Sequence, residues 1–276
     1  MIKIAIQGIR GAFHEVAARR FYGNEAAIVP ALTFQELFQI TEAGRQCDAA
    51  IVAIENSLAG SILGNYKLLK NSSLTIVGEV LLPIGQHLMA LPGVRLEDLT
   101  EVHSHPMALA QCELFLRRYP HLRLVEADDT AASAERIQRN QTRHIAAIAS
   151  DLAAEIYGLE IIAPNIEDDQ SNTTRFLALV PPEMSSKYAT STPNKASICF
   201  VTPHKPGALS YVLGMMAYHG ANLTKIQSLP VEGKIWEYRF FVDYIFEQET
   251  DHQRILKNLT DNVTDLQILG TYAASL

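Results

Sequence analysis

The sequence predicts an α/β protein in two parts, a larger domain over residues 1–180 and a smaller one over residues 195–276. In the first part, short apolar runs alternate with segments of helical periodicity, which is typical of a mostly parallel sheet covered by helices. Residues 181–194 are rich in Pro, Ser and Thr and lack periodicity, as expected of a linker. After them the order is strand, helix, strand, strand, helix, strand, which is the ferredoxin-like pattern.

The elements of the larger domain follow from local signals. The run at 47–54 is continuously apolar, which indicates a strand buried on both faces. Pro106 can open a helix because proline is tolerated in a first turn, and Asp151 and Gly158 are expected at the two ends of another helix. Strands are therefore expected at 3–8, 47–54, 101–105, 144–150 and 176–180, and helices at 13–23, 107–119 and 152–158.

In the smaller domain the same signals give four strands and two helices. The first helix is expected to end near Gly220, because glycine commonly ends a helix. The strands are expected at 196–202, 222–230, 236–246 and 266–273, and the helices at 207–220 and 251–262.

Composition narrows the functional class. The 276 residues are 48% hydrophobic and 19% charged, which suits a globular protein with a sizeable core. A net charge of −7 argues against nucleic acid or an acidic membrane surface as the main partner. The three cysteines lie far apart, so we expect neither a disulfide framework nor a metal site of cysteines. With no signal-peptide pattern and no apolar run long enough to span a bilayer, we expect a cytoplasmic protein.

Polar groups follow several predicted strands, where ligands collect in open α/β sheets. Arg10 lies between two glycines after the first strand, "ENS" (55–57) ends the second, "SHP" (104–106) ends the third, and Ser150 with Asp151 ends the fourth. Several of these ends precede a helix, whose free N–H groups favour an anion. The pattern therefore predicts a crevice for a small anionic ligand.

Each signal also has an ordinary structural alternative. "GIRG" (8–11) can be a tight turn, and it lacks the third glycine of a dinucleotide fingerprint. "ENS" can be a turn with a helix cap, and "TTR" (173–175) can be surface. His103 and His105 share a strand face, yet no third metal ligand is apparent nearby, so we expect no metal.

Four motifs, taken in order, resemble the prephenate dehydratase family. The first loop keeps Gly8, Gly11, Phe13 and Ala17; the others are "AIENSLAG" (53–60), "SHPMALAQC" (104–112) and "NTTRF" (172–176). The last part of the chain resembles the ligand-sensing domain called ACT. The sequence departs from the family pattern in the first loop, where Ile9, Ala12 and His14 replace a proline and two hydroxyl residues, and at Met107, which replaces a glutamine.

The resemblance implies two α/β lobes like those of type 2 periplasmic binding proteins, followed by the ferredoxin-like domain. It implies decarboxylating dehydration of prephenate to phenylpyruvate in L-phenylalanine biosynthesis, without a cofactor. The family assigns the key role to the threonine that is Thr174 here, which we interpret as a positioned hydrogen-bond donor. Arg175 is a substrate contact or a core ion pair. The implied substrate-binding residues are Arg10, Asn56, Ser57, Ser104, His105, Gln111 and Arg175.

For the last domain, the resemblance implies phenylalanine binding between the subunits of a homodimer or homotetramer, with inhibition of the enzyme. Two departures stand in the second effector motif, where Gln227 replaces a glutamate and Leu229 an arginine. The implied effector residues are Gly207, Ala208, Leu209, Ser210, Asn222, Leu223, Gln227, Ser228, Leu229 and Pro230. The alternatives are that this domain only dimerises, that the whole protein is a non-catalytic amino-acid sensor, or that the two histidines serve a metal hydrolase.

Overall fold

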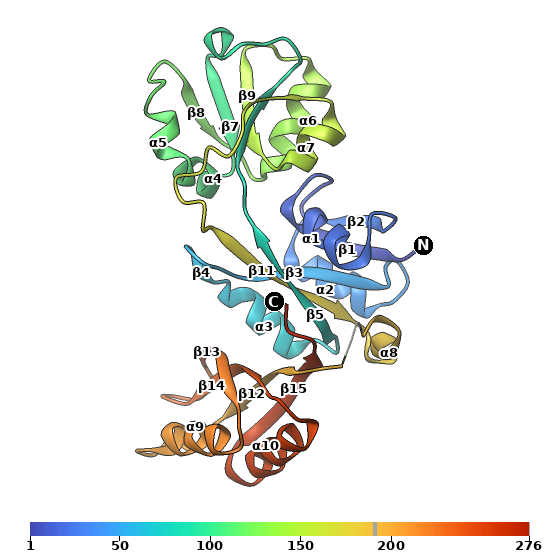
Figure 1. Ribbon diagram of the computed structural model, residues 1–276, viewed down its shortest axis with the longest axis vertical. Helices are drawn as coiled ribbons and strands as arrows, with labels where there is room; N and C mark the ends of the chain where they lie inside the picture. The colour runs from blue at the N-terminus through green and yellow to red at the C-terminus, as the bar shows by residue number, and fades with distance from the viewer. Residues whose placement is uncertain (190–191, 276) are drawn as a thin grey trace. The chain divides into compact units, whose positions relative to one another are not determined.

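The computed structural model describes residues 1–189 and 192–275 and contains three sheets (Figure 1). The predicted α/β class and ferredoxin-like domain are confirmed. By contacts, the chain divides into two compact units. Unit 1 comprises Met1–Gly60 and Val80–Phe176, and unit 2 comprises Ser61–Glu79 and Leu177–Leu276. The predicted domain boundaries at 180 and 195 remain predictions.

The first sheet has the strand order β2-β1-β3-β11-β5, with β4 paired to β3. Strand β1 is parallel to both β2 and β3, and its three central residues are fully buried, as the apolar runs predict. Strands β5 and β11 each continue from one unit into the other. The strands are β1 (Lys3–Gln7), β2 (Ala27–Ala31), β3 (Ala49–Asn56), β4 (Gly60–Ser61), β5 (Thr75–Pro83) and β11 (Thr173–Val180), and the helices of this lobe are α1 (Phe13–Tyr22) and α2 (Phe34–Glu42).

The second sheet of unit 1 has the order β10-β6-β9-β7-β8. Strand β7 is parallel to β8 and β9, whereas β6 is antiparallel to β9 and β10. The elements are β6 (His87–Ala90), η1 (Leu96–Asp98), β7 (Glu101–Ser104), α4 (Pro106–Gln111), α5 (Glu113–Leu116), β8 (Arg123–Glu126), α6 (Thr130–Asn140), β9 (Ile145–Ala149), α7 (Asp151–Tyr157) and β10 (Glu160–Ala163).

Two local predictions in this lobe are wrong. The helix expected over 107–119 is two helices, because the backbone leaves helical geometry at the fully buried Cys112, with φ −116° and ψ 22°. The cap of α7 is Ser150 and not Asp151. Ser150 has extended geometry and its hydroxyl accepts a hydrogen bond from the Ala153 N–H, while Asp151 is already helical. Gly158 ends the helix in the left-handed conformation, as expected.

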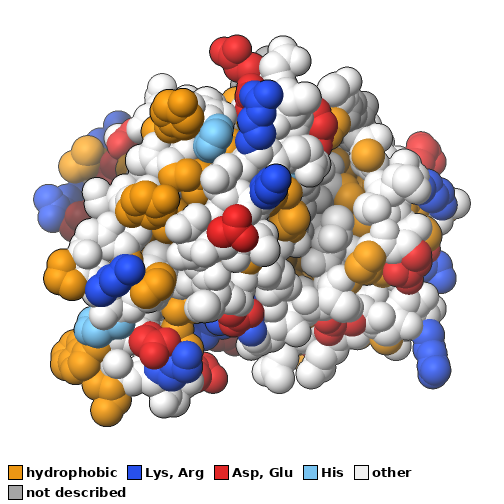
Figure 2. Space-filling model, turned by 90° about the horizontal axis from the view of Figure 1, so that it is seen from below, with side chains coloured by type: hydrophobic (Ala, Val, Ile, Leu, Met, Phe, Trp, Pro, Cys, Tyr) orange, Lys and Arg blue, Asp and Glu red, His pale blue; other side chains and the backbone are white. Residues whose placement is uncertain are grey.

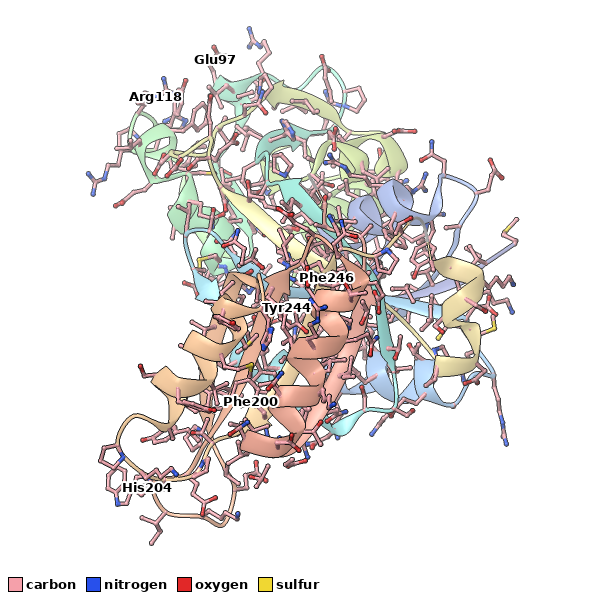
Figure 3. The ribbon with its side chains drawn as sticks, turned by 60° about the horizontal axis from the view of Figure 1, so that its bottom comes forward. Glu97, Arg118, Phe200, His204, Tyr244 and Phe246 are labelled. Atoms are coloured by element: carbon pink, nitrogen blue, oxygen red, sulfur yellow. The ribbon has the colours of Figure 1, made fainter. Side chains whose placement is uncertain are left out.

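Unit 2 contains the ferredoxin-like domain, with strand order β13-β14-β12-β15. Its core lies between the sheet and its two helices, where Phe200, Tyr244 and Phe246 are buried (Figure 3). The elements are β12 (Lys195–Val201), α9 (Ala208–Tyr218), β13 (Asn222–Pro230), β14 (Tyr238–Ile245), α10 (Glu249–Asn262) and β15 (Thr264–Tyr272). The predicted linker carries η2 (Pro182–Met184) and α8 (Ser185–Tyr188), while Thr190 and Ser191 lie outside the described residues.

Helix α3 (Leu63–Asn71) and the first part of β5 group with this domain through specific contacts. The Tyr66 ring on α3 meets Phe241 of β14 edge-on at 5.1 Å between centroids. Glu79 on β5 accepts hydrogen bonds from Lys195 Nζ at 2.9 Å on both carboxylate oxygens, and both residues are buried. Breaking a buried ion pair typically costs about 3–5 kcal/mol, so this contact ties β5 to the first strand of the ferredoxin-like sheet.

Basic and acidic side chains are interspersed with apolar ones on the face shown in Figure 2. Within residues 1–189 and 192–275, no helix is long and apolar enough to cross a membrane. The same residues contain no cluster of three or more His, Cys, Asp or Glu that could hold a metal ion.

Replacing Gly270 with alanine should destabilise unit 2. Gly270 lies beside the irregularity where β15 pairs with β12, and a Cβ there would meet the Ile76 carbonyl oxygen and lie 2.6 Å from Ile76 Cβ. The obstacle is backbone, which cannot turn aside as a flexible side chain can. Overpacking of this kind typically costs about 1–3 kcal/mol, to be measured by urea unfolding.

Gly214→Ala is the matched control. Gly214 lies inside α9 and a Cβ there would meet nothing within 4 Å. Alanine should stabilise the helix by about 0.5–1 kcal/mol, because glycine loses more backbone entropy on folding. Equal stability of Gly270→Ala and the wild type would contradict the close approach of β15 to β5.

Candidate active site

The "ENS" and "NTTRF" motifs meet where β3 ends and β11 begins. The Ser57 N–H donates to the Thr173 carbonyl oxygen at 2.8 Å, and the Thr173 N–H donates to Ser57 Oγ at 2.9 Å. Motifs separated by more than a hundred residues are therefore held side by side at one edge of the sheet. Two of the predicted substrate-binding residues, Asn56 and Ser57, come together with the predicted catalytic residue, Thr174.

The Asn56 amide is the centre of this cluster. Its Nδ2 donates to Thr174 Oγ1 at 2.9 Å and to Asn172 Oδ1 at 2.7 Å. Its Oδ1 accepts hydrogen bonds from the N–H groups of Leu58 and Ala59, at 3.0 and 2.8 Å. Because backbone donors hold the oxygen end, the NH₂ end can only point towards Thr174 and Asn172.

The hydrogen bond from Asn56 also determines which hydrogen bonds the Thr174 hydroxyl can still form. Thr174 is 9% exposed, and its oxygen accepts from Asn56. A hydroxyl has one proton to donate, and no other described residue accepts it from Thr174. The hydrogen bond from Asn56 thus orients the Thr174 hydroxyl, and the hydroxyl proton remains available for a ligand.

Asn172 adds a second donor that sequence reasoning did not assign to the site. It is 1% exposed, its Oδ1 is used by Asn56, and its Nδ2 has no hydrogen-bond partner among the described residues. A buried donor without a partner is costly, typically about 1–3 kcal/mol. A ligand or water that accepts from Asn172 Nδ2 would remove that cost. The signal in the sequence was its place in the same motif as Thr174.

Arg175 points away from this cluster. Successive side chains alternate between the faces of a strand, so Arg175 and Glu55 lie on the face opposite to Thr174 and Asn56. The Arg175 guanidinium and the Glu55 carboxylate form an ion pair at 3.2 Å, and Arg175 is 6% exposed. Of the two roles left open for Arg175, this geometry supports the ion pair.

His14 lies on the Thr174 side of β11. Thr174 and Phe176 share a face, and the His14 ring meets the Phe176 ring edge-on at 5.0 Å. Its Nε2 accepts a hydrogen bond from the Ala53 N–H at 3.4 Å. Burial lowers the pKa of His14 from 6.5 to about 4, so the imidazole is neutral at pH 7. The residue that replaces a family hydroxyl is therefore neither a cation for substrate nor a strong base.

The first loop is packed against the second lobe of unit 1. The Ser150 hydroxyl donates to the Gly11 carbonyl oxygen at 2.6 Å, and the Tyr157 hydroxyl donates to the Arg10 carbonyl oxygen at 2.8 Å. Gly11 has φ 85°, and a Cβ there would lie 2.8 Å from Ala153 Cα. Glycine is required by both conformation and space. The Arg10 side chain itself is exposed.

The "SHP" residues are engaged in the fold. The Ser104 hydroxyl is fully buried and donates to the Ile148 carbonyl oxygen at 2.6 Å. The exposed His105 caps α4, with Nδ1 accepting from the Met107 N–H at 3.2 Å. Gln111 Oε1 accepts from Gln86 Nε2 at 3.4 Å. Gln86, which sequence reasoning missed, is 3% exposed, and its Oε1 has no partner among the described residues. The binding roles of these residues remain predictions.

A separate cavity of about 290 Å³ lies in unit 2 at the start of α9. Gly207, with φ 79°, precedes the helix, and Gly207–Ser210 all line the cavity. Aromatic residues that the sequence did not point to complete it: Trp236, Tyr238 and Phe240. The other predicted effector residues lie elsewhere on β13, with Asn222 and Leu223 at its start and Gln227–Pro230 at its end. One chain therefore gathers only the first effector motif at this cavity.

The fold is α/β, and the cluster of Asn56, Asn172 and Thr174 contains neutral hydrogen-bond donors in fixed orientations. The family model of prephenate dehydratase matches residues 4–183. The Arabidopsis thaliana protein named arogenate dehydratase/prephenate dehydratase 6, chloroplastic, is 42% identical over 287 residues, or 98% of this chain and 68% of that protein. The chain thus spans about two thirds of that relative's length.

Two solved structures resemble the whole chain. Prephenate dehydratase from Arthrobacter aurescens in complex with L-Phe has a TM-score of 0.86 at 29% identity, covering 99% of this chain and 90% of that one. GqqA, described as a novel type of quorum quenching acylase, has a TM-score of 0.88 at 34% identity, covering 99% and 98%. The chain belongs to the prephenate dehydratase family. The family predicted from the four motifs is confirmed, and so, at the level of the family, is the prediction of an enzyme.

Replacing His14 with phenylalanine should reduce the loss of stability in acid. Burial lowers the pKa of His14 to about 4, so below pH 6.5 the unfolded chain takes up a proton that the folded protein excludes. This contribution to wild-type stability is complete above pH 6.5 and declines as the pH falls towards 4. Urea unfolding at about pH 7.5 and about pH 5 should show a smaller difference for His14→Phe than for the wild type.

The control is His121→Phe, because His121 is exposed. It should keep the acid sensitivity of the wild type. An unchanged pH dependence in His14→Phe would mean that this imidazole titrates freely in the folded protein.

Proposed function

We propose that this protein is a prephenate dehydratase, which converts prephenate to phenylpyruvate, carbon dioxide and water in phenylalanine biosynthesis. The observation that carries the proposal is the Thr174 hydroxyl, whose oxygen is held by Asn56 and whose proton is left for a ligand. Membership of the family supports the substrate. The reaction takes place in the ring of the substrate, and the protein's task is to bind it and assist departure of the ring hydroxyl.

The electron balance explains why a neutral donor suffices. The bond from the ring to the departing carboxylate breaks, its electron pair enters the ring, and the ring expels the hydroxyl group as the aromatic system forms. The expelled oxygen gains negative charge in the transition state, takes up one proton from the solvent and leaves as water. In this proposal the Thr174 hydroxyl donates to that oxygen, and the Asn172 amide, whose oxygen accepts from the same Asn56 nitrogen as Thr174, is a second donor. Aromatisation supplies the driving force, so no strong acid is required.

The similar proteins suggest two other activities that an assay must distinguish from dehydration of prephenate. The Arabidopsis relative is named for both arogenate and prephenate, which differ in carrying an ammonium or a keto group. The acylase-like neighbour would call for a nucleophile beside a base, yet the Thr174 partner is an amide. The nearby His14 is held by Ala53 and is a weak base, because burial lowers its pKa to about 4. These features favour dehydration over acyl transfer.

Thr174→Ala should lower turnover by about 10²–10³, the usual cost of losing one transition-state donor. Formation of phenylpyruvate from prephenate is followed by absorbance, with circular dichroism to verify the fold. Thr174→Ser is the matched variant, because it keeps the hydroxyl that Asn56 orients, and it should stay within about tenfold of wild type.

Wild type that forms no phenylpyruvate above the spontaneous rate would favour a non-catalytic amino-acid sensor. Near-normal turnover in folded Thr174→Ala would remove the hydroxyl from the mechanism. Arogenate in place of prephenate in the same assay decides which of the two is the better substrate.

We also propose that phenylalanine inhibits the enzyme through the cavity at the start of α9, as part of an ACT domain. Helix N-termini offer free N–H groups for a carboxylate, and Trp236, Tyr238 and Phe240 provide an aromatic wall. The Arthrobacter aurescens structure holds L-Phe, which supports this effector. A cytoplasmic homodimer or homotetramer remains part of the proposal, with the second effector motif expected from a neighbouring subunit.

Tyr238→Ala should weaken phenylalanine binding about tenfold, because it removes apolar contact from the cavity wall. Calorimetric titration and inhibition of phenylpyruvate formation give the two measurements. Tyr218→Ala is the control, since Tyr218 is 85% exposed on α9 outside this cavity. Absence of both binding and inhibition in the wild type at millimolar phenylalanine would leave the domain without a sensing role.

A further inference from the structure

A second cavity in unit 2 lies on the opposite face of the ferredoxin-like sheet, with a volume of about 200 Å³. Side-chain alternation along β14 explains the separation: Tyr238 and Phe240 face the cavity at the start of α9, whereas Arg239 and Phe241 face this one. Its other walls are α3, through Lys67, Lys70 and Asn71, and the segment 229–232. Two residues of the second effector motif, Leu229 and Pro230, also line it.

Three cationic side chains line the cavity, and they differ in their ion-pair partners. Lys67 Nζ lies 3.7 Å from a Glu232 carboxylate oxygen, and the Glu232 side chain is 87% exposed. Arg239 is paired with Asp265. Lys70 is half-buried and has no hydrogen-bond or ion-pair partner among the described residues.

Lys70 also acts electrostatically on the carboxylate that Arg239 binds. The pKa of Asp265 is lowered chiefly by its hydrogen bond from Arg239, and the charges of Arg239, Lys70 and Lys234 lower it further. Lys70 is partly removed from water and makes no direct ion pair among the described residues, so it favours an anionic ligand. The cavity thus has positive charge to spare on one side.

The opposite side of the cavity is apolar. Leu229, Pro230 and Phe241 line it, and Leu229 and Phe241 are almost completely buried. An engineered cavity of about 150 Å³ accepts benzene, so this volume accommodates a ring or branched chain together with a carboxylate. Among the described residues that line the cavity, Glu232 is the one acid, and it lies at the exposed rim beside Lys67. The described lining therefore gives an ammonium group no carboxylate partner in the interior.

We propose that this cavity binds a small carboxylate with an apolar body and no ammonium group, such as an aryl-substituted short-chain or 2-oxo acid. Lys70 binds the carboxylate, and Leu229, Pro230 and Phe241 cover the apolar body. Such a ligand joins α3 to the ferredoxin-like sheet and is distinct in chemistry and place from phenylalanine at the start of α9. The proposal does not depend on the dehydratase reaction.

The test uses 3-phenylpropionate, which is neither the proposed substrate nor its product, titrated calorimetrically into the full chain. For a ligand of this size we expect a Kd of about 1 mM or tighter. Lys70→Gln should raise that Kd about tenfold or more, while Lys257→Gln, an exposed lysine of α10, should leave it unchanged. Phenylalanine binding should be the same in wild type and Lys70→Gln.

A charge reversal sharpens the result. Lys70→Glu should lose 3-phenylpropionate and gain binding of phenethylamine, the matching cation. Urea unfolding of each variant establishes that it is folded. The proposal is overturned if wild type does not bind at about 10 mM, tenfold above the weakest expected Kd, or if folded Lys70→Gln binds as wild type does. It is equally overturned if affinity is lost only in Tyr238→Ala, which would place the ligand at the other cavity.

Discussion

The orientation of one amide, that of Asn56, is the constraint on which the candidate active site depends. Two backbone N–H groups hold its oxygen, so its nitrogen must face Thr174 and Asn172. That arrangement exists only because the end of β3 and the start of β11 are joined by reciprocal bonds between Ser57 and Thr173. A slip of one residue in this register would exchange the Asn56 and Glu55 faces and present a carboxylate to the hydroxyl.

The alternation of side chains along β3 and β11 also places the charged residues and the neutral hydrogen-bonding residues on opposite faces of the sheet. On one face Asn56, Asn172 and Thr174 form a neutral network, and His14 remains neutral because burial lowers its pKa to about 4. On the other face Glu55 and Arg175 cancel each other's charge. Among the described residues, the hydrogen-bond partner of the Thr174 hydroxyl is the neutral Asn56 amide. Neutral donors suit the proposed dehydration, since their hydrogen bonds strengthen as negative charge develops on the departing oxygen.

The features of this site that depend on local residue order could be predicted from the sequence. Those that depend on strand register could not. The motifs predicted that Asn56 and Thr174 belong together, because each follows or begins a strand at the same sheet edge. The role of Asn172 and the choice of Glu55 as partner of Arg175 require the antiparallel alignment of segments far apart in the chain. The cap at Ser150 was missed because the next residue, Asp151, is an equally good capping residue. The break at Cys112 was missed because the residues on both sides of it favour a helix.

The grouping of residues 61–79 with the C-terminal domain could not be predicted either, because it depends on contacts between residues far apart in the sequence, among them the buried Glu79–Lys195 pair. From Glu79 the chain runs directly to Ile84, whose N–H donates to the Asn172 carbonyl oxygen at 2.8 Å. The segment that begins at the Glu79–Lys195 pair therefore ends at a hydrogen bond to Asn172. The side chains of Asn172 and Thr174 both accept hydrogen bonds from the Asn56 amide. A ligand shifts a conformational equilibrium only to the extent that its affinity differs between the conformations, so the proposed inhibition requires phenylalanine to bind one conformation of the chain more tightly than another.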